Sequence, residues 1–222
     1  NPNIRTMRIL RPITIKEISK EKYVVDMGQN MVGWLAVKLK GTKNKPVTLR
    51  YAETTQKDGN IYTANLRGSR TTDIYTPAKD GSFSYEPRFV YHGFRYVEIS
   101  GIDQLPSLSD LAGKVNYDFM DNIGTFETSD TTLNQIYKNA CWGIMGNYRS
   151  FPTDCPQRDE RMGWLGDRAT GCVGESFIFN NQLLYSKWTQ DINDSQKESG
   201  SLPDVAPAYW PFYSDNIDEK MG

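Results

Sequence analysis

The residues of this chain that could do chemistry lie close together, between positions 154 and 167. Asp154 and Arg158 are followed by two further carboxylates, Glu160 and Asp167, with an indole, Trp164, between them. On a helix, Glu160, Trp164 and Asp167 would be spaced i, i+4, i+7 and would share one face. A sugar-cleaving pocket needs carboxyl groups for proton transfer, polar groups for hydroxyls and a flat ring for the apolar sugar face. These residue types are those that a sugar-cleaving pocket requires.

A helix N-terminus without chemistry is the alternative explanation of this stretch. Acidic side chains are stabilised near the positive end of a helix dipole, which would account for Asp159 and Glu160. It would not account for Trp164 and Gly166 beside Asp167. Residue types alone leave both interpretations open.

A resemblance to a known family favours the catalytic interpretation. Residues 151–167 read Phe-Pro-Thr-Asp-Cys-Pro-Gln-Arg-Asp-Glu-Arg-Met-Gly-Trp-Leu-Gly-Asp. They closely resemble the signature of the bacterial α-L-rhamnosidase family, inverting glycoside hydrolases that release terminal L-rhamnose. Residues 26–34 and 85–99 resemble strands of that family's β-sandwich, and residues 124–134 resemble the entry into its helical barrel. Since these segments occur in the family's order, the resemblance extends over essentially the whole chain.

The resemblance implies a role for each residue of the signature. Glu160 matches the general acid, which protonates the glycosidic oxygen as the bond to rhamnose breaks. Asp154, Arg158 and Asp167 match residues that hydrogen-bond the rhamnose hydroxyls, and Trp164 matches an aromatic residue of the pocket wall. Inversion also needs a second carboxylate, about 6.5–9.5 Å from the carboxyl group of the acid, which activates a water molecule. In the family this base is a late glutamate, which would follow the last residue of this chain.

Two further features of the sequence bear on this assignment: the other glutamates of the α part and an arginine beside the signature. Glu175, Glu198 and Glu219 are present, but none matches the base in position. We therefore expect residues 1–222 alone to be inactive. Arg168, directly after Asp167, departs from the family pattern, in which a small residue is expected, and it would alter the charge beside the pocket.

Composition excludes several classes of protein. The 222 residues carry a net charge of −1, which offers no general attraction for nucleic acid. No apolar run approaches the ~20 residues that cross a bilayer. The resemblance implies no cofactor, and it implies rhamnose-containing glycosides or polysaccharides as partners. Exposed apolar helix faces in the isolated chain would favour a homodimer. The sequence leaves the compartment, the aglycone and the linkage open.

Cysteine and histidine usage predicts no metal site. Cys141, Cys155 and Cys172 lack metal-ligand spacing, and their odd number argues against a disulfide framework. Cys155 lies within the signature and is interpreted as a packing residue. The single histidine, His92, lies in a strand-like run and is interpreted as a structural side chain rather than a base.

A change of hydrophobic period divides the chain into a β part and an α part. We predict an antiparallel β-sandwich domain over residues 1–113 and a connecting strand and linker over 114–129. The predicted strands are 7–10, 22–26, 34–40, 47–52, 70–76, 95–99 and 114–116, with a turn at 78–82 and a linker at 105–113.

The α part, residues 130–222, is predicted to begin an (α/α)6 barrel. Its first helix, capped by Ser129 or Asp130, runs from about 131 to 146, a second from about Asp159 to Phe177, and a third from about 181 to 195, with Gly200 ending it. A proline-broken loop follows. A full barrel needs about twelve helices of about 11 residues, so the predicted barrel is incomplete in this chain.

Two alternative functions stay open at this level. The first is a non-catalytic carbohydrate-binding β-sandwich module, whose sugar platform would consist of Trp34, Tyr62, Tyr91 and Phe94. Strand aromatics are more often core residues, which weakens that alternative. The second is another inverting glycosidase on the same barrel, which would differ in the sugar rather than in the chemistry.

Overall fold

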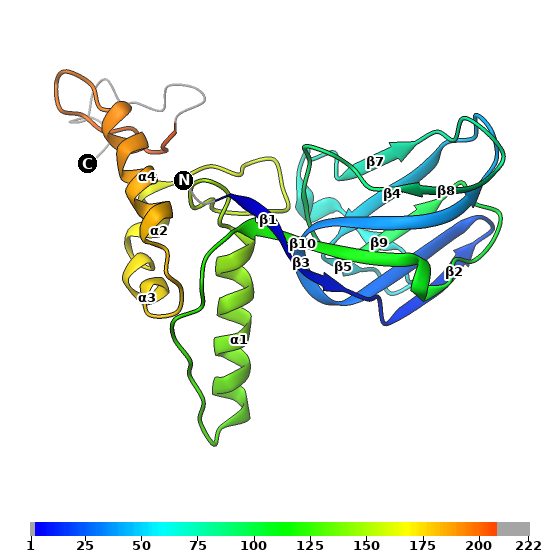
Figure 1. Cartoon of the computed structure of the whole chain (residues 1–222), viewed down its shortest axis with the longest axis horizontal. Helices are drawn as coiled ribbons and strands as arrows, with labels where there is room; N and C mark the ends of the chain where they lie inside the picture. The colour runs from blue at the N-terminus through cyan, green and yellow to red at the C-terminus, as the bar shows by residue number, and fades with distance from the viewer. Residues whose placement is uncertain (1–2, 208–222) are drawn as a thin grey trace. The chain divides into compact units, whose positions relative to one another are not determined.

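The computed structural model describes residues 3–207, which form two compact units (Figure 1). The sandwich unit comprises Thr6–Tyr117 together with Pro156–Asp159. The helical unit comprises residues up to Arg5, Asp118–Cys155 and the chain from Glu160 on. No helix among the described residues is long and apolar enough to span a membrane.

Antiparallel strands build the sandwich unit. The described strands are β1 (Ile4–Leu10), β2 (Thr14–Ser19), β3 (Lys22–Gly41), β4 (Val47–Ala52), β5 (Thr54–Thr55), β6 (Ile61–Tyr62), β7 (Thr72–Tyr75), β8 (Gly81–Tyr85), β9 (His92–Ser100) and β10 (Leu111–Asp118). Two short 3₁₀ helices, η1 (Ala64–Leu66) and η2 (Leu108–Asp110), lie between them. The predicted fold class, an antiparallel β-sandwich followed by the first helices of a barrel, is confirmed.

The long strand β3 joins the two layers of the sandwich. It pairs with β2 over 22–26, with β9 over 22–26 and 31–33, with β10 over 33–37 and with β8 over 37–41. The pairing with β9 shifts register between Asp26 and Met31 and then continues to Gly33, where the pairing with β10 begins. Strands that pass from one layer to the other commonly do so at a bulge. Segment 26–34, one of the family-like stretches of the sequence, is this corner.

Glycine makes the corner possible. Gly33 pairs with both His92 and Val115, and a Cβ at this position would lie 1.8 Å from the carbonyl oxygen of Lys114. Gly28 has a φ of 74°, a conformation that residues with a side chain rarely adopt. The Asp26 carboxylate accepts a hydrogen bond from the Gly28 N–H (2.7 Å) and two from Arg95 (2.8 and 2.9 Å).

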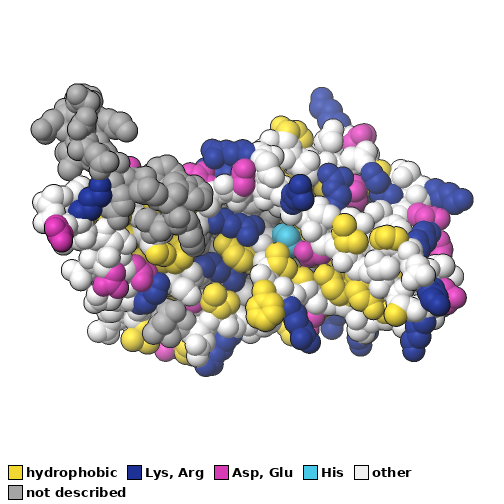
Figure 2. Space-filling view, turned by 90° about the horizontal axis from the view of Figure 1, so that it is seen from above, with side chains coloured by type: hydrophobic (Ala, Val, Ile, Leu, Met, Phe, Trp, Pro, Cys, Tyr) yellow, Lys and Arg dark blue, Asp and Glu magenta, His cyan; other side chains and the backbone are white. Residues whose placement is uncertain are grey.

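The core follows from alternation along the strands. Leu35, Val37 and Leu39 of β3 are buried between the layers, whereas Lys38 faces solvent, as a period of two requires. The face of the sandwich unit visible in Figure 2 carries hydrophobic side chains among Lys and Arg side chains.

The strand predictions are confirmed for the most part. Segments 22–26 and 34–40 are, however, two parts of the single strand β3, because the bulge hides its continuity in the sequence. Strands β2, β5, β6 and β8 were not predicted. The predicted turn at 78–82 overlaps β8, and the predicted linker at 105–113 overlaps η2 and β10. Both β8 and β10 pair with β3. Strand pairing outweighs local sequence propensity in sheets, which is why these two segments are strands.

Four helices lie in the described part of the helical unit: α1 (Thr131–Gly146), α2 (Leu165–Ala169), α3 (Cys172–Ser176) and α4 (Gln182–Asp194). The Asp130 carboxylate caps α1 by accepting hydrogen bonds from the N–H groups of Thr132 (2.7 Å) and Leu133 (3.3 Å). The first and third predicted helices are therefore confirmed. Gly200, with a φ of 86°, lies beyond the end of α4 and does not terminate it.

The predicted helix from Asp159 to Phe177 is wrong. Residues 156–163 are irregular, Arg161 has a φ of 56°, and only the short helices α2 and α3 follow. Hydrogen bonds to distant segments, described below, hold this backbone out of a helix. The predicted proline-broken loop is irregular through residue 207, and its remainder lies outside the described residues.

Candidate functional site

A closed loop brings the carboxyl groups of Asp154 and Glu160 together. The Asp154 N–H donates to the Met162 carbonyl oxygen (2.9 Å), and the Met162 N–H donates to Asp154 Oδ1 (2.7 Å). These two bonds clamp the two ends of the loop. As a result, a carboxylate oxygen of Asp154, the Cys155 Sγ and a carboxylate oxygen of Glu160 all lie within 4.8 Å of one another.

The two oxygens of Asp154 have different surroundings. Oδ1 accepts the backbone hydrogen bond of Met162, which fixes the orientation of the carboxylate. Oδ2 is buried and has no hydrogen-bond partner among residues 3–207. A buried carboxylate oxygen without a donor is costly, so this atom suits a ligand hydroxyl. Asp154 closes a loop and does not cap a helix.

Trp164 is held through its backbone. It forms an isolated β-bridge with Val205, and the Ala206 N–H donates to the Gly163 carbonyl oxygen (3.0 Å). A Cβ at Gly163 would lie 2.2 Å from the Ala206 oxygen, so only glycine fits this approach. The Trp188 indole N–H donates to the same oxygen (2.7 Å). Trp164 is thereby placed at the start of α2, half-buried.

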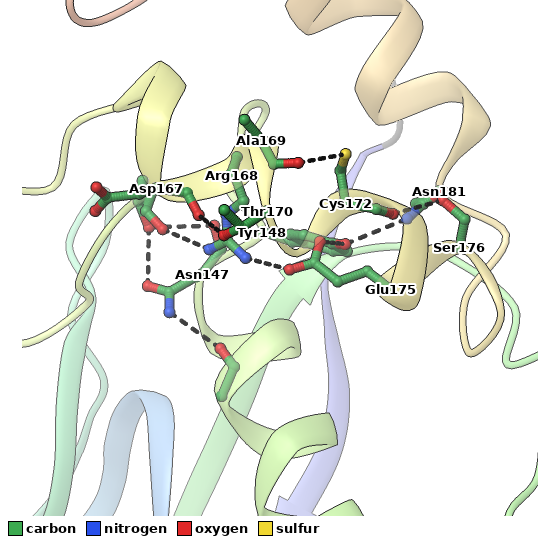
Figure 3. Close-up of polar contacts among 12 residues, drawn as sticks. Asn147, Tyr148, Asp167, Arg168, Ala169, Thr170, Cys172, Glu175, Ser176 and Asn181 are labelled. Atoms are coloured by element: carbon green, nitrogen blue, oxygen red, sulfur yellow. Dashed lines mark hydrogen bonds and ion pairs between the residues drawn. The ribbon is translucent and has the colours of Figure 1, made fainter.

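The structure separates the remaining predicted site residues. Asp167 lies in the first turn of α2, is exposed, and points away from Glu175 in Figure 3. The predicted single helix face bearing Glu160, Trp164 and Asp167 does not exist, because α2 begins only at Leu165. Arg158 belongs to segment 156–159, which is part of the sandwich unit. There the Gly68 N–H donates to Asp159 Oδ2 (3.2 Å).

A buried carboxylate, that of Glu175 in α3, organises the residues around the loop (Figure 3). It forms an ion pair with Arg168 of α2 and accepts hydrogen bonds from the hydroxyls of Tyr148 and of Tyr185, the latter at 2.6 Å. Asn181 donates to the Tyr148 oxygen (3.3 Å). We call these five residues the Glu175 cluster. Burial, together with the hydrogen bonds to Glu175, raises the pKa of Tyr148 and of Tyr185 above the usual tyrosine value.

The Glu175 cluster also reaches the proposed site. The Arg168 guanidinium donates a second hydrogen bond to the carbonyl oxygen of Thr153 (2.8 Å), the residue before Asp154. This contact gives a physical reason for the arginine that departs from the family pattern. Its charge is directed to Glu175 rather than into solvent. Sequence reasoning missed the pair, although the seven-residue spacing of an Arg and a Glu was a possible signal.

Glu175 is not placed to act as a base. Its carboxylate is only 5% exposed and binds three donors, from Arg168, Tyr148 and Tyr185. A general base must instead reach a water molecule. The described structure therefore indicates a structural role for Glu175.

Several other predicted residues can now be placed. His92 is buried, bonds to both carboxylate oxygens of Asp73 (3.1 Å each) and stacks on Tyr51, so its structural interpretation is confirmed. Among the described residues, Cys141, Cys155 and Cys172 form no disulfide, and Cys155 is buried. Phe94 is fully buried and cannot belong to a sugar platform, which corrects that part of the prediction.

The group formed by Asp154, Cys155 and Glu160 also has the spacing of a three-ligand cation site. The same spacing allows Asp154 and Glu160 to contact one sugar ring. No side chain outside these three completes a ligand set of His, Cys, Asp and Glu within the described residues.

Two family models match the chain in succession. The concanavalin-like domain of bacterial alpha-L-rhamnosidases matches residues 16–117, and the six-hairpin glycosidase domain of bacterial alpha-L-rhamnosidases matches residues 121–220. An alpha-L-rhamnosidase of Streptomyces avermitilis is 40% identical over 91% of this chain and 20% of its own length. One from Alteromonas sp. (strain LOR) is 38% identical over 92% of this chain and 22% of its own length. The chain thus spans about a fifth of the curated relatives that it matches.

Solved structures agree with the sequence matches. The alpha-L-rhamnosidase from Dictyoglumus thermophilum superposes with a TM-score of 0.93 at 42% identity, covering 96% of this chain and 24% of that one. The Streptomyces avermitilis alpha-L-rhamnosidase complexed with L-rhamnose gives a TM-score of 0.90 at 38% identity, covering 97% of this chain and 20% of that one.

The Glu175 cluster predicts a large effect of a small substitution. We expect Glu175→Gln to lower the free energy of unfolding by about 3–5 kcal/mol, because Arg168 would stay buried without its counter-charge. Urea unfolding of the chain followed by tryptophan fluorescence measures this. Glu198→Gln, at an exposed position, is the matched control and should change stability by less than about 0.5 kcal/mol. Equal stability of the two variants would contradict the anchoring role.

Proposed function

Because the chain belongs to the bacterial α-L-rhamnosidase family, we propose that its protein is a glycoside hydrolase that releases terminal non-reducing α-L-rhamnose from α-L-rhamnosides. The observation that carries the proposal is the loop that sets the carboxyl groups of Asp154 and Glu160 within 4.8 Å of each other. This loop lies in the segment that resembles the family signature. Rhamnose-containing glycosides or polysaccharides are the proposed substrates.

Glu160 is the proposed general acid. It is partly exposed, so that a glycosidic oxygen can reach its carboxyl group. Protonation of that oxygen makes the aglycone a better leaving group as the anomeric bond breaks. Positive charge then develops at the anomeric carbon, and the nearby Asp154 carboxylate would stabilise it electrostatically.

Asp154 is the proposed acceptor for rhamnose hydroxyls. Its Oδ2 atom is buried and has no partner among the described residues, whereas Oδ1 is held by the Met162 N–H. One oxygen thus orients the side chain and the other is available to substrate. Asp167 and Arg158 are proposed to bind further hydroxyls, and Trp164 to pack against the sugar.

Inversion of configuration is the proposed stereochemical course. It requires a base that activates water on the face opposite the acid, about 6.5–9.5 Å away. The resemblance assigns this role to a glutamate after residue 222, and the three donors bound to Glu175 argue against that residue as a substitute. The acid and the base would then come from different parts of the protein.

The acid assignment predicts the behaviour of Glu160→Gln in the enzyme that contains this chain. Glutamine keeps the shape of the side chain but cannot donate the proton, so turnover of a natural rhamnoside should fall by about 10²–10⁴-fold. An aryl rhamnoside with an activated leaving group should lose less, because its departure needs less protonation. The proposed inversion is tested separately on the wild-type enzyme, because proton NMR shows which anomer of rhamnose is released first. Turnover in the variant within a few-fold of wild type would remove Glu160 from the acid role.

The hydroxyl-binding assignment predicts weaker sugar binding after charge removal. Asp154→Asn and Asp167→Asn should each weaken rhamnose binding by about 1.5–3 kcal/mol, since charge-assisted hydrogen bonds are lost. Isothermal titration of the same enzyme with L-rhamnose measures this. Asp194→Asn, on the exposed surface of α4, is the control and should bind as wild type does. Unchanged affinity in both test variants would make these aspartates structural.

Residues 1–222 alone are predicted not to turn over an aryl rhamnoside. The proposed acid is present, but the proposed base is not among these residues. Rhamnose release is measured for this chain and for an enzyme that carries it with the rest of the glycosidase domain. A rate for the shorter chain comparable with that of the longer one would place the base within residues 1–222, and Glu219 would be tested first.

A further inference from the structure

A second candidate site lies wholly within the sandwich unit. It is an open groove with a volume of about 750 Å³. Its lining combines aromatic, cationic and small residues: Arg11, Trp34, Ala36, Val37, Lys38, Ser84, Tyr85, Glu86, Pro87, Arg88, Phe89, Ser109, Asp110, Ala112 and Lys114. We call it the sandwich groove. None of the residues to which the proposed hydrolysis assigns a role lines it.

Small residues on paired strands form the floor of the sandwich groove. Ala36 of β3 lies directly opposite Ala112 of β10, next to the pair formed by Trp34 and Lys114. Directly opposite residues in an antiparallel sheet have side chains on the same face. Two alanines therefore leave a depression, flanked by an indole and an ammonium group.

One wall of the groove presents aromatic surface. Segment 86–89 follows β8, and its Glu86 accepts a hydrogen bond from the Trp34 indole N–H (3.1 Å), which orients both side chains. Phe89 is fully exposed and has a φ of 60°. This backbone conformation is unusual for a bulky residue and costs free energy, and such residues are concentrated at binding sites. An exposed Phe89 ring gains no packing that would offset this cost, whereas contact with a ligand would offset it.

Positive charge dominates the groove. Four cationic residues line it, against the two carboxylates of Glu86 and Asp110. Arg11 is engaged by the carbonyl oxygens of Ser109 and Leu111. The side chains of Lys38, Arg88 and Lys114, by contrast, make no hydrogen bond or ion pair within residues 3–207. Three cations without partners around one depression favour an anionic ligand.

We propose that the sandwich groove binds an anionic saccharide, a sugar chain bearing carboxylate or sulfate groups. Aromatic side chains would pack against the apolar faces of the sugar rings, as they do in sugar sites generally. The Arg88 guanidinium and the two ammonium groups would bind the acidic substituents through charge-assisted hydrogen bonds. The choice of a saccharide over other polyanions rests on the proposed function. The groove would hold an acidic polysaccharide while rhamnose is removed from it.

Binding to a probe without rhamnose tests this independently of hydrolysis. The 222-residue chain is titrated calorimetrically with an oligogalacturonate and with its methyl-esterified form, which has the same sugars without the charges. The charged probe should bind at least about tenfold more tightly, and its affinity should fall as salt screens the interaction. A sulfated oligosaccharide of equal length shows which acidic group is preferred.

Three variants locate the site. Lys38→Ala/Arg88→Ala should weaken binding of the preferred anionic oligosaccharide by at least about tenfold, and Phe89→Ala by about fivefold. Lys57→Ala, an exposed lysine of the turn at 57–60, should bind as wild type does. Thermal unfolding of each variant confirms that the fold is retained. Glu160→Gln, which disables the proposed hydrolysis, should leave this binding unchanged.

Several results would overturn the proposal. These are no measurable binding of either anionic oligosaccharide, equal affinity for the methyl-esterified probe, or equal loss of affinity in the control variant. A single-stranded DNA of equal charge that binds as tightly would show a general polyanion surface rather than a sugar site. The two proposals can fail separately. If the enzyme does not hydrolyse rhamnosides but the groove substitutions still weaken binding of the anionic oligosaccharide, the proposed hydrolysis is wrong and the proposed binding site is supported.

Discussion

The buried carboxylate of Glu175 is the interaction on which the helical unit depends. A carboxylate removed from water is destabilising by several kcal/mol unless donors surround it, and here Arg168, Tyr148 and Tyr185 supply them. These donors come from α2, from the segment that follows α1 and from α4. Four segments therefore have to meet at one point. Because Arg168 also binds the carbonyl oxygen of Thr153, the position of the neighbouring Asp154 is set by the same requirement.

Glu160, the proposed acid, and Asp154, the proposed hydroxyl acceptor, consequently sit on a loop that its neighbours hold in place. Asp154 and Met162 exchange two hydrogen bonds across the loop, and Gly163 meets Ala206 so closely that no side chain fits between them. Irregular backbone of this kind can direct neighbouring side chains to one point, which a helix cannot do for residues six apart. In this conformation the carboxyl groups of Asp154 and Glu160 lie within 4.8 Å of each other, close enough to contact one sugar.

In the sandwich unit, the corresponding constraint is the corner of β3. Gly28 and Gly33 let one strand serve both layers, and the second part of that strand carries Trp34, Ala36 and Lys38 on its outer face. The alternation that buries Leu35 and Val37 thus also supplies the floor of the sandwich groove. A domain that encloses a core can in this way carry a ligand surface on its other face without disturbing its packing.

The sequence by itself determined the family, the order of β part and α part, most strands, helices α1 and α4, and the structural nature of His92. These features depend on patterns within short segments: alternation, helical spacing, an Asp at a helix start, and a family signature that residues 151–167 resemble. Only the tertiary structure decided that residues 156–163 form no helix, that β8 exists, and that Arg168 pairs with Glu175 rather than facing the pocket. Each of these depends on hydrogen bonds or charges between residues far apart in the sequence or on separate elements, such as Gly163 with Ala206, and local propensity does not encode such partners.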